Sequence, residues 1–139
     1  MLEAVGDSAA ALSEYQDLVK LDPDSVYGQL GSGALLLKQG KKDEAMTALQ
    51  RATAIDPKNF EARWSLGRAL LLSGRYAEAA EVLQVAVTLQ PQRADAHYQL
   101  GQALTRLGKS EEARNEFAIV DRLNVEFRRN SSSMGPEKQ

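Results

Sequence analysis

The sequence predicts an all-α solenoid built from repeated pairs of antiparallel helices. Three kinds of residue recur at intervals of 34 positions: glycines at Gly6, Gly40, Gly74 and Gly108, alanines at Ala11, Ala45, Ala79 and Ala113, and prolines at Pro23, Pro57 and Pro91. A fixed period of this length is typical of supersecondary units that bury their apolar faces only by stacking on one another. We therefore expect the function to lie in a surface that several units share.

The period divides the chain into three full units and one half unit. The predicted segments are a second helix of a truncated unit within residues 1–25, full units at 26–59, 60–93 and 94–127, and a polar, disordered tail at 128–139. The half-unit helix is expected from about Ser8 to Lys20. Each full unit carries two stretches whose apolar residues recur every three or four positions, as one face of a helix requires.

Glycine and proline mark the predicted helix ends. Gly40, Gly74 and Gly108 follow the first helix of each unit, where a residue that adopts positive φ without steric cost is favoured. The prolines at 23, 57 and 91 should end each second helix, because proline disfavours helical geometry in the residue before it. Short connections between the helices then predict antiparallel pairs.

We call a set of positions that recur every 34 residues a column, and two sets of columns predict the core. Mid-helix glycines at Gly33, Gly67 and Gly101 are expected to let the paired helix approach at the alanine column. Larger residues should fill the outer layer, in the columns Tyr15, Leu49, Leu83 and Phe117, and Leu21, Ile55, Leu89 and Leu123.

Composition excludes several classes of function. With 17 basic and 19 acidic side chains the chain is near neutral, so it lacks the positive charge that a nucleic-acid partner would require. No apolar run is long enough to insert into a membrane, and the first ten residues lack the pattern of a signal peptide. We expect a soluble protein, and the absence of cysteine fits the cytoplasm and the periplasm equally.

The sequence predicts no catalytic residues, metal ligands or cofactor-binding residues. His97 is the single histidine, and no predicted column brings a nucleophile, a base and an orienting partner together. Gly31-Ser32-Gly33 is not a dinucleotide-binding motif, because Leu36 stands where the third glycine would be and no strand precedes it.

The repeat resembles the tetratricopeptide repeat (TPR) family over about nine tenths of the chain. The middle unit carries Trp64-Ser65-Leu66-Gly67, Gly74-Arg75-Tyr76, Ala79, Leu83, Ala86 and Pro91, and the third carries Tyr98-Gln99-Leu100-Gly101, Gly108, Ala113 and Phe117. Two positions depart from the family pattern. Ser32 replaces a leucine, and Val125 replaces the last proline, so we expect the final helix to continue past Leu123 to about Arg129.

The resemblance implies a right-handed superhelix whose concave wall, lined by the first helix of each unit, binds a peptide or a partner helix. The residues that it places on this wall are Tyr27, Leu30, Leu37, Lys38, Trp64, Arg68, Leu71, Tyr98, Gln102 and Arg106. The lysines and asparagines of the chaperone-binding subclass do not carry over, and the asparagine ladder of a second subclass is replaced by Gly31, Ser65 and Gln99.

Two features of the wall leave alternatives open. Trp64 and Tyr98 either pack against neighbouring helices or serve as exposed anchors, the role in which Trp and Tyr are enriched at interfaces. The additional glycines Gly28 and Gly31 indicate either a mobile first helix or a shallow place where a ligand backbone approaches.

The half unit predicts self-association. Ala11, Leu12, Tyr15 and Val19 would lose the cover of a missing first helix, and an exposed apolar edge favours a two-fold homodimer. Alternatively, Met1 to Ala4 fold back over the edge, or a longer parent protein covers it.

The predicted function is a protein interaction module, part of a bacterial-type scaffold or adaptor. The alternatives are a regulatory or targeting segment of a larger enzyme, and self-assembly alone.

Overall fold

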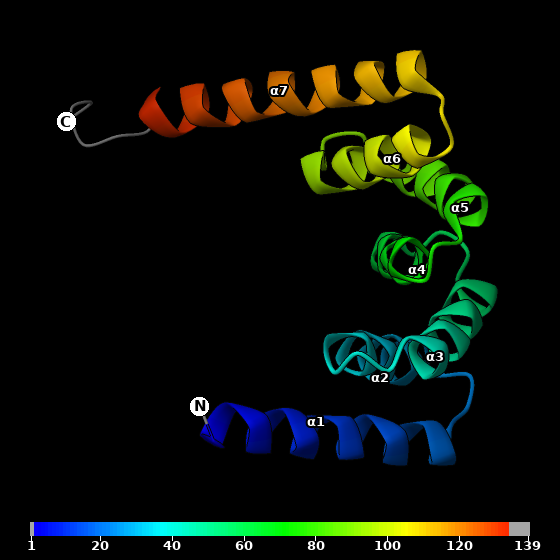
Figure 1. Cartoon of the computed structure of the whole chain (residues 1–139). Helices are drawn as coiled ribbons and strands as arrows, with labels where there is room; N and C mark the ends of the chain where they lie inside the picture. Colours follow the sequence, from blue (N-terminus) through cyan, green and yellow to red (C-terminus); the bar gives the residue numbers. More distant parts are fainter. Residues whose placement is uncertain (1, 134–139) are drawn as a thin grey trace.

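A computed structural model describes residues 2–133, and for residues 2–6 and 133 it describes the backbone alone. The described part consists of seven helices: α1 (Leu2–Leu21), α2 (Val26–Lys38), α3 (Lys42–Ile55), α4 (Phe60–Leu72), α5 (Tyr76–Leu89), α6 (Ala94–Arg106) and α7 (Ser110–Ser133). They follow one another along an open arc, with α2, α4 and α6 on the inner side and α3 and α5 on the outer side (Figure 1). The predicted fold class is confirmed.

The glycines end the first helices as predicted. Gly40, Gly74 and Gly108 have φ of 81°, 76° and 78°, and they are the positive-φ residues of the described chain. At the first of them, the amide of Lys41 donates to the carbonyl of Leu36 at 2.9 Å, and the amide of Gly40 donates to that of Leu37 at 3.0 Å. This pair of bonds satisfies helix carbonyls that would otherwise lack a partner.

The prolines also end the second helices as predicted, at Leu21, Ile55 and Leu89. Each proline carbonyl then accepts a hydrogen bond from a side chain six residues further on, in the next first helix. The donors occupy one column of the repeat: Gln29 Nε2 at 3.0 Å, Arg63 Nε at 3.0 Å and His97 Nε2 at 2.8 Å. This bond ties each connection to the first helix of the next unit.

The mid-helix glycines contact a different column from the predicted one. A Cβ atom at Gly67 would lie 2.5 Å from Leu83, and one at Gly101 would lie 2.7 Å from Phe117. The glycines therefore accommodate the large residues of the second helix, and Gly33 also approaches the carbonyl of Ala45 in the alanine column. The core runs through the units because each second helix also packs against the first helix of the next unit.

The two end helices are longer than predicted. Helix α1 begins at Leu2 rather than near Ser8 and passes through Gly6, so residues 2–4 extend the helix instead of folding back. Helix α7 runs to Ser133, so residues 128–133, which we expected in a disordered tail, are helical, and residues 134–139 lie outside the described part. No proline interrupts either stretch, and a helix continues where nothing breaks it.

Candidate functional site

The inner side of the arc carries nearly all the residues predicted for the concave wall. Six of them are exposed: Tyr27, Lys38, Arg68, Tyr98, Gln102 and Arg106. Three are half-buried, namely Leu30, Trp64 and Leu71. Leu37 is 9% exposed and belongs to the core, so its predicted place on the wall is wrong. Leu36 and Leu37 both face the core. The apolar face of a helix is at least 100° wide, and successive residues are 100° apart, so two adjacent residues can both be buried.

Trp64 combines the two roles that the sequence left open. Its ring packs against the core, and its indole Nε1 is buried without a hydrogen-bond partner. The guanidinium of Arg68, one turn further along α4, lies 6.0 Å from the ring centroid. The exposed guanidinium of Arg68 thus lies beside the half-buried indole on the wall.

Tyr98 is more exposed than Trp64. It is 49% exposed on α6, and the edge of its ring leans on Phe117 of α7 at a centroid distance of 5.7 Å. A half-exposed ring held from one side has little rotamer freedom left to lose when a ligand binds, which favours contact with a partner.

A pocket of about 240 Å³ lies between α4, the start of α5, and α6. It is lined by Arg68, Leu71 and Leu72 of α4, Tyr76 of α5, and Gln99, Gln102 and Arg106 of α6. The structure brings together four of the predicted wall residues here, and Leu72, Tyr76 and Gln99 also line the pocket. The sequence places Tyr76 only in the repeat motif Gly74-Arg75-Tyr76; its position in the first turn of α5 is the signal that it could reach the wall.

The charges in this pocket are all positive. The guanidinium of Arg106 lies over the ring of Tyr76 at 5.2 Å, as that of Arg68 lies over Trp64, and no acidic residue lines the pocket. Oε1 of Gln99 is buried and has no hydrogen-bond partner among the described residues. The pocket therefore presents cationic donors beside apolar side chains.

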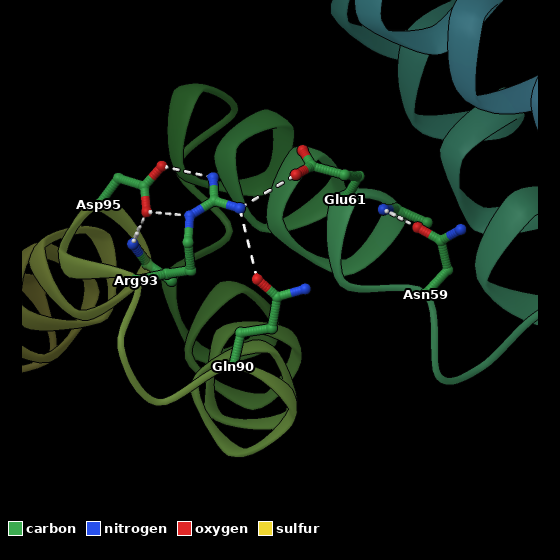
Figure 2. Close-up of polar contacts among 7 residues, drawn as sticks. Asn59, Glu61, Gln90, Arg93 and Asp95 are labelled. Atoms are coloured by element: carbon green, nitrogen blue, oxygen red, sulfur yellow. Dashed lines mark hydrogen bonds and ion pairs between the residues drawn. The ribbon is translucent and has the colours of Figure 1, made fainter.

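The acidic residues at the rim of the wall are already paired (Figure 2). Arg93 donates to Asp95 at 2.9 Å and to Glu61 at 3.1 Å, and its guanidinium lies over the ring of Phe60 at 4.4 Å. Hydrogen bonds to Asp95 and then to Glu61 raise the pKa of Arg93, so this side chain stays charged. The cluster joins the start of α4 to the start of α6, and it pairs both carboxylates with one arginine.

Comparison with known families identifies the repeat. One tetratricopeptide repeat model matches residues 2–60 and 35–94, and a second matches residues 70–126. The chain belongs to the tetratricopeptide repeat family. No curated protein matches the sequence.

Solved structures of TPR proteins have the same fold. A crystal structure of MamA has a TM-score of 0.83 and 27% identity, covering 91% of this chain and 74% of MamA. MamA from Desulfovibrio magneticus RS-1, from residue 41 onward, has a TM-score of 0.80 and 27% identity, with 90% and 71% covered. YrrB, described as a TPR protein with an unusual peptide-binding site, has a TM-score of 0.80 and 26% identity, with 89% and 64% covered. These matches support a protein interaction module.

The residues predicted for self-association pack against α2 instead of forming an uncovered edge. Leu12 is buried, Val19 lies against Gly28, and the ring of Tyr15 lies against Gly31. Tyr15 also donates a hydrogen bond to the hydroxyl of Tyr27 at 3.4 Å, which raises the pKa of Tyr15. The first helix of the next unit supplies this cover, and Ala11 is half-buried beside it.

Two of our interpretations change with this packing. Gly31 makes room for the Tyr15 ring, so it has a packing role that neither reading of the additional glycines included. Leu21, which we placed in the core, is 86% exposed at the end of α1. A homodimer through α1 stays a prediction.

Membrane spans and metal sites are absent from the described residues. None of the seven helices in residues 2–133 has both the length and the hydropathy needed to cross a bilayer. Within the same residues, no group of three or more potential ligand side chains is arranged to hold a metal ion. His97, the single histidine, uses both ring nitrogens in contacts with Pro91 and Glu116.

Proposed function

We propose that the inner wall formed by α2, α4 and α6 binds an extended peptide or a helix of a partner protein. The observation that carries this proposal is the pocket between α4 and α6, where apolar, aromatic and cationic side chains converge. Aromatic and arginine side chains in such a setting are the usual energetic anchors of interfaces. The likeness to YrrB supports a peptide as ligand, because that TPR protein is described as having a peptide-binding site.

The alternative role, a regulatory or targeting segment of a larger enzyme, would use the same wall. In that case the bound segment would belong to the enzyme or to its target, and the catalytic residues would lie outside this chain. Binding by the isolated chain does not separate the two roles; the full-length sequence does. A homodimer through α1 is compatible with both, and light scattering at high micromolar concentration measures it directly.

The test maps binding onto the wall. A displayed library of random 12-residue peptides is selected against the protein, and enriched peptides are titrated while backbone amide resonances are recorded. We expect shifts concentrated in α4 and α6. Replacement of Tyr98 by alanine should weaken binding by about 2 kcal/mol, the scale of an interface anchor.

The control is Val85→Ala, which changes a partly exposed apolar residue of α5, on the outer side of the arc. It should leave affinity unchanged. Shifts confined to α3, α5 and α7, or equal effects of the Tyr98 and Val85 substitutions, would place binding elsewhere and contradict the proposal. Thermal melts of both variants check that the fold is retained.

A further inference from the structure

We infer that the pocket between α4 and α6 selects a segment carrying an aspartate or glutamate, with the carboxylate held between Arg68 and Arg106 and apolar neighbours resting on Leu71 and Leu72. This inference rests on the proposed binding role of the inner wall. It goes further by naming the chemistry of the bound group and the residues that recognise it.

The first support is the state of the two arginines. Each guanidinium lies over an aromatic ring, with Cζ of Arg68 6.0 Å from the centroid of Trp64 and Cζ of Arg106 5.2 Å from that of Tyr76, and neither makes a hydrogen bond or ion pair with another described residue. The N–H groups of both guanidinium groups are therefore available as donors to a ligand. Two such groups facing one pocket match the oxygens of one carboxylate.

The second support is the distribution of acidic residues. The pocket contains none, and the carboxylates of Glu61 and Asp95, at the starts of α4 and α6, are held by Arg93. Among the described residues, no carboxylate is paired with Arg68 or Arg106. An acidic segment is the partner whose charge complements the pocket, and a basic one would be repelled.

The third support is the unpartnered side chain at the back of the pocket. A buried polar atom without a hydrogen bond is costly, and Oε1 of Gln99 is such an atom. Because this oxygen is buried, a main-chain amide of an extended segment reaches it only when the Gln99 side chain rotates toward the pocket on binding. With that rotation Gln99 supplies a contact that requires a polypeptide, whereas the arginines supply one that requires an acid.

The experiment uses the peptides enriched in the library selection described above, resynthesised with each acidic residue replaced by its amide. Affinity is measured by peptide fluorescence anisotropy and by the emission of Trp64, the single tryptophan of the chain, which lies beside Arg68. The protein variants are Arg68→Gln and Arg106→Gln. The matched control is Arg114→Gln, at an exposed arginine of α7 that does not line the pocket.

We expect the enriched peptides to share one acidic position flanked by apolar residues. Changing that residue to its amide should weaken binding about tenfold or more, the scale of a hydrogen bond to a charged group. Each pocket variant should cause a similar loss, and the control variant should cause none. On the pocket variants the amide peptide should bind almost as well as the acidic one, because the interaction has already been removed.

Two results would overturn the inference in distinguishable ways. If the peptides shift α4 and α6 resonances and alter Trp64 emission, but lose less than twofold when the acid becomes an amide, the carboxylate assignment is wrong and the binding wall stands. If no enriched peptide affects α4, α6 or Trp64, the inference and the proposed function both fail. Thermal melts of the variants exclude unfolding as the cause of lost binding.

Discussion

His97 and Glu116 form a buried contact between α6 and α7, with the imidazole Nδ1 3.0 Å from the carboxylate Oε1. The other ring nitrogen lies 2.8 Å from the carbonyl oxygen of Pro91, which can only accept a hydrogen bond. The imidazole therefore connects the end of one unit to both helices of the next. The single histidine of the chain, which offered no chemistry in the sequence, has a structural role.

Removal of this imidazole should destabilise the third unit. His97→Ala leaves the largely buried carboxylate of Glu116 and the Pro91 carbonyl without their partner, at a cost of about 2–3 kcal/mol. His97→Gln should cost less, because Gln29 makes the corresponding bond to Pro23 in the first unit. Urea unfolding measures both; equal midpoints for the two variants would show that the proline bond contributes nothing.

The mid-helix glycines should differ in their tolerance of a methyl group. At Gly67 a Cβ would meet Leu83, which is completely buried, whereas at Gly101 it would meet the partly exposed ring of Phe117. Alanine gains up to about 1 kcal/mol in helix propensity over glycine. We expect Gly101→Ala to be close to neutral and Gly67→Ala to lose about 1–2 kcal/mol, since overpacking outweighs that gain.

Thermal denaturation compares these two variants. Gly101→Leu serves as the third member of the series and should be destabilised by about 1–3 kcal/mol, because a longer side chain cannot be accommodated by a shift of one ring. A Gly67→Ala protein that is more stable than the original would mean that α4 and α5 separate without cost.

The cluster around Arg93 should contribute modestly to stability. Its side chain is about one-third exposed, and its partners Glu61 and Asp95 are about half exposed, so solvent screens the ion pairs. We expect Arg93→Ala to cost about 1 kcal/mol, chiefly through lost packing on Phe60. Arg93→Met keeps much of that packing and should recover most of the loss; a Met variant as unstable as the Ala variant would assign the stabilisation to the ion pairs.

Ser32 offers a way to strengthen the first unit. It is buried, its hydroxyl has no hydrogen-bond partner, and the corresponding positions hold the buried leucines Leu66 and Leu100. Ser32→Leu should raise the free energy of unfolding by about 1 kcal/mol. Ser32→Ala, which removes the hydroxyl without adding volume, is the control. A lower melting temperature for the leucine variant alone would show that the surrounding core is already full.

Helix ends inside the array could be predicted from the sequence because each depends on one residue. Gly40 reaches a positive φ that other residues avoid, and Pro57 cannot continue a helix, whatever packs around them. The outer ends of α1 and α7 depend on the absence of such residues. There the repeat pattern predicts a helix from about Ser8, but α1 begins at Leu2 and includes Gly6, because glycine weakens a helix without stopping it.

Only some of the residues that line the pocket could be predicted. The reason is that they come from both the first and the second helices of the units. The places of Arg68 and Arg106 on the wall are what the resemblance to the TPR family implies. The contribution of Tyr76 does not follow from it, because it depends on where the start of α5 meets the end of α6, a relation that only packing between units determines. The burial of Leu37 likewise depends on how wide the contact between helices is, which the spacing of apolar residues does not give.

The column that bonds to the proline carbonyls holds glutamine, arginine and histidine, three side chains that a comparison of repeats by identity would score as unrelated. What the backbone requires at this position is a donor of sufficient reach, so its variation is constrained by geometry rather than by residue type. At this hydrogen bond, the three donor side chains therefore fulfil the same structural role in different repeats. A designer who transplanted one unit into another array would need to preserve the donor and could choose its chemistry freely.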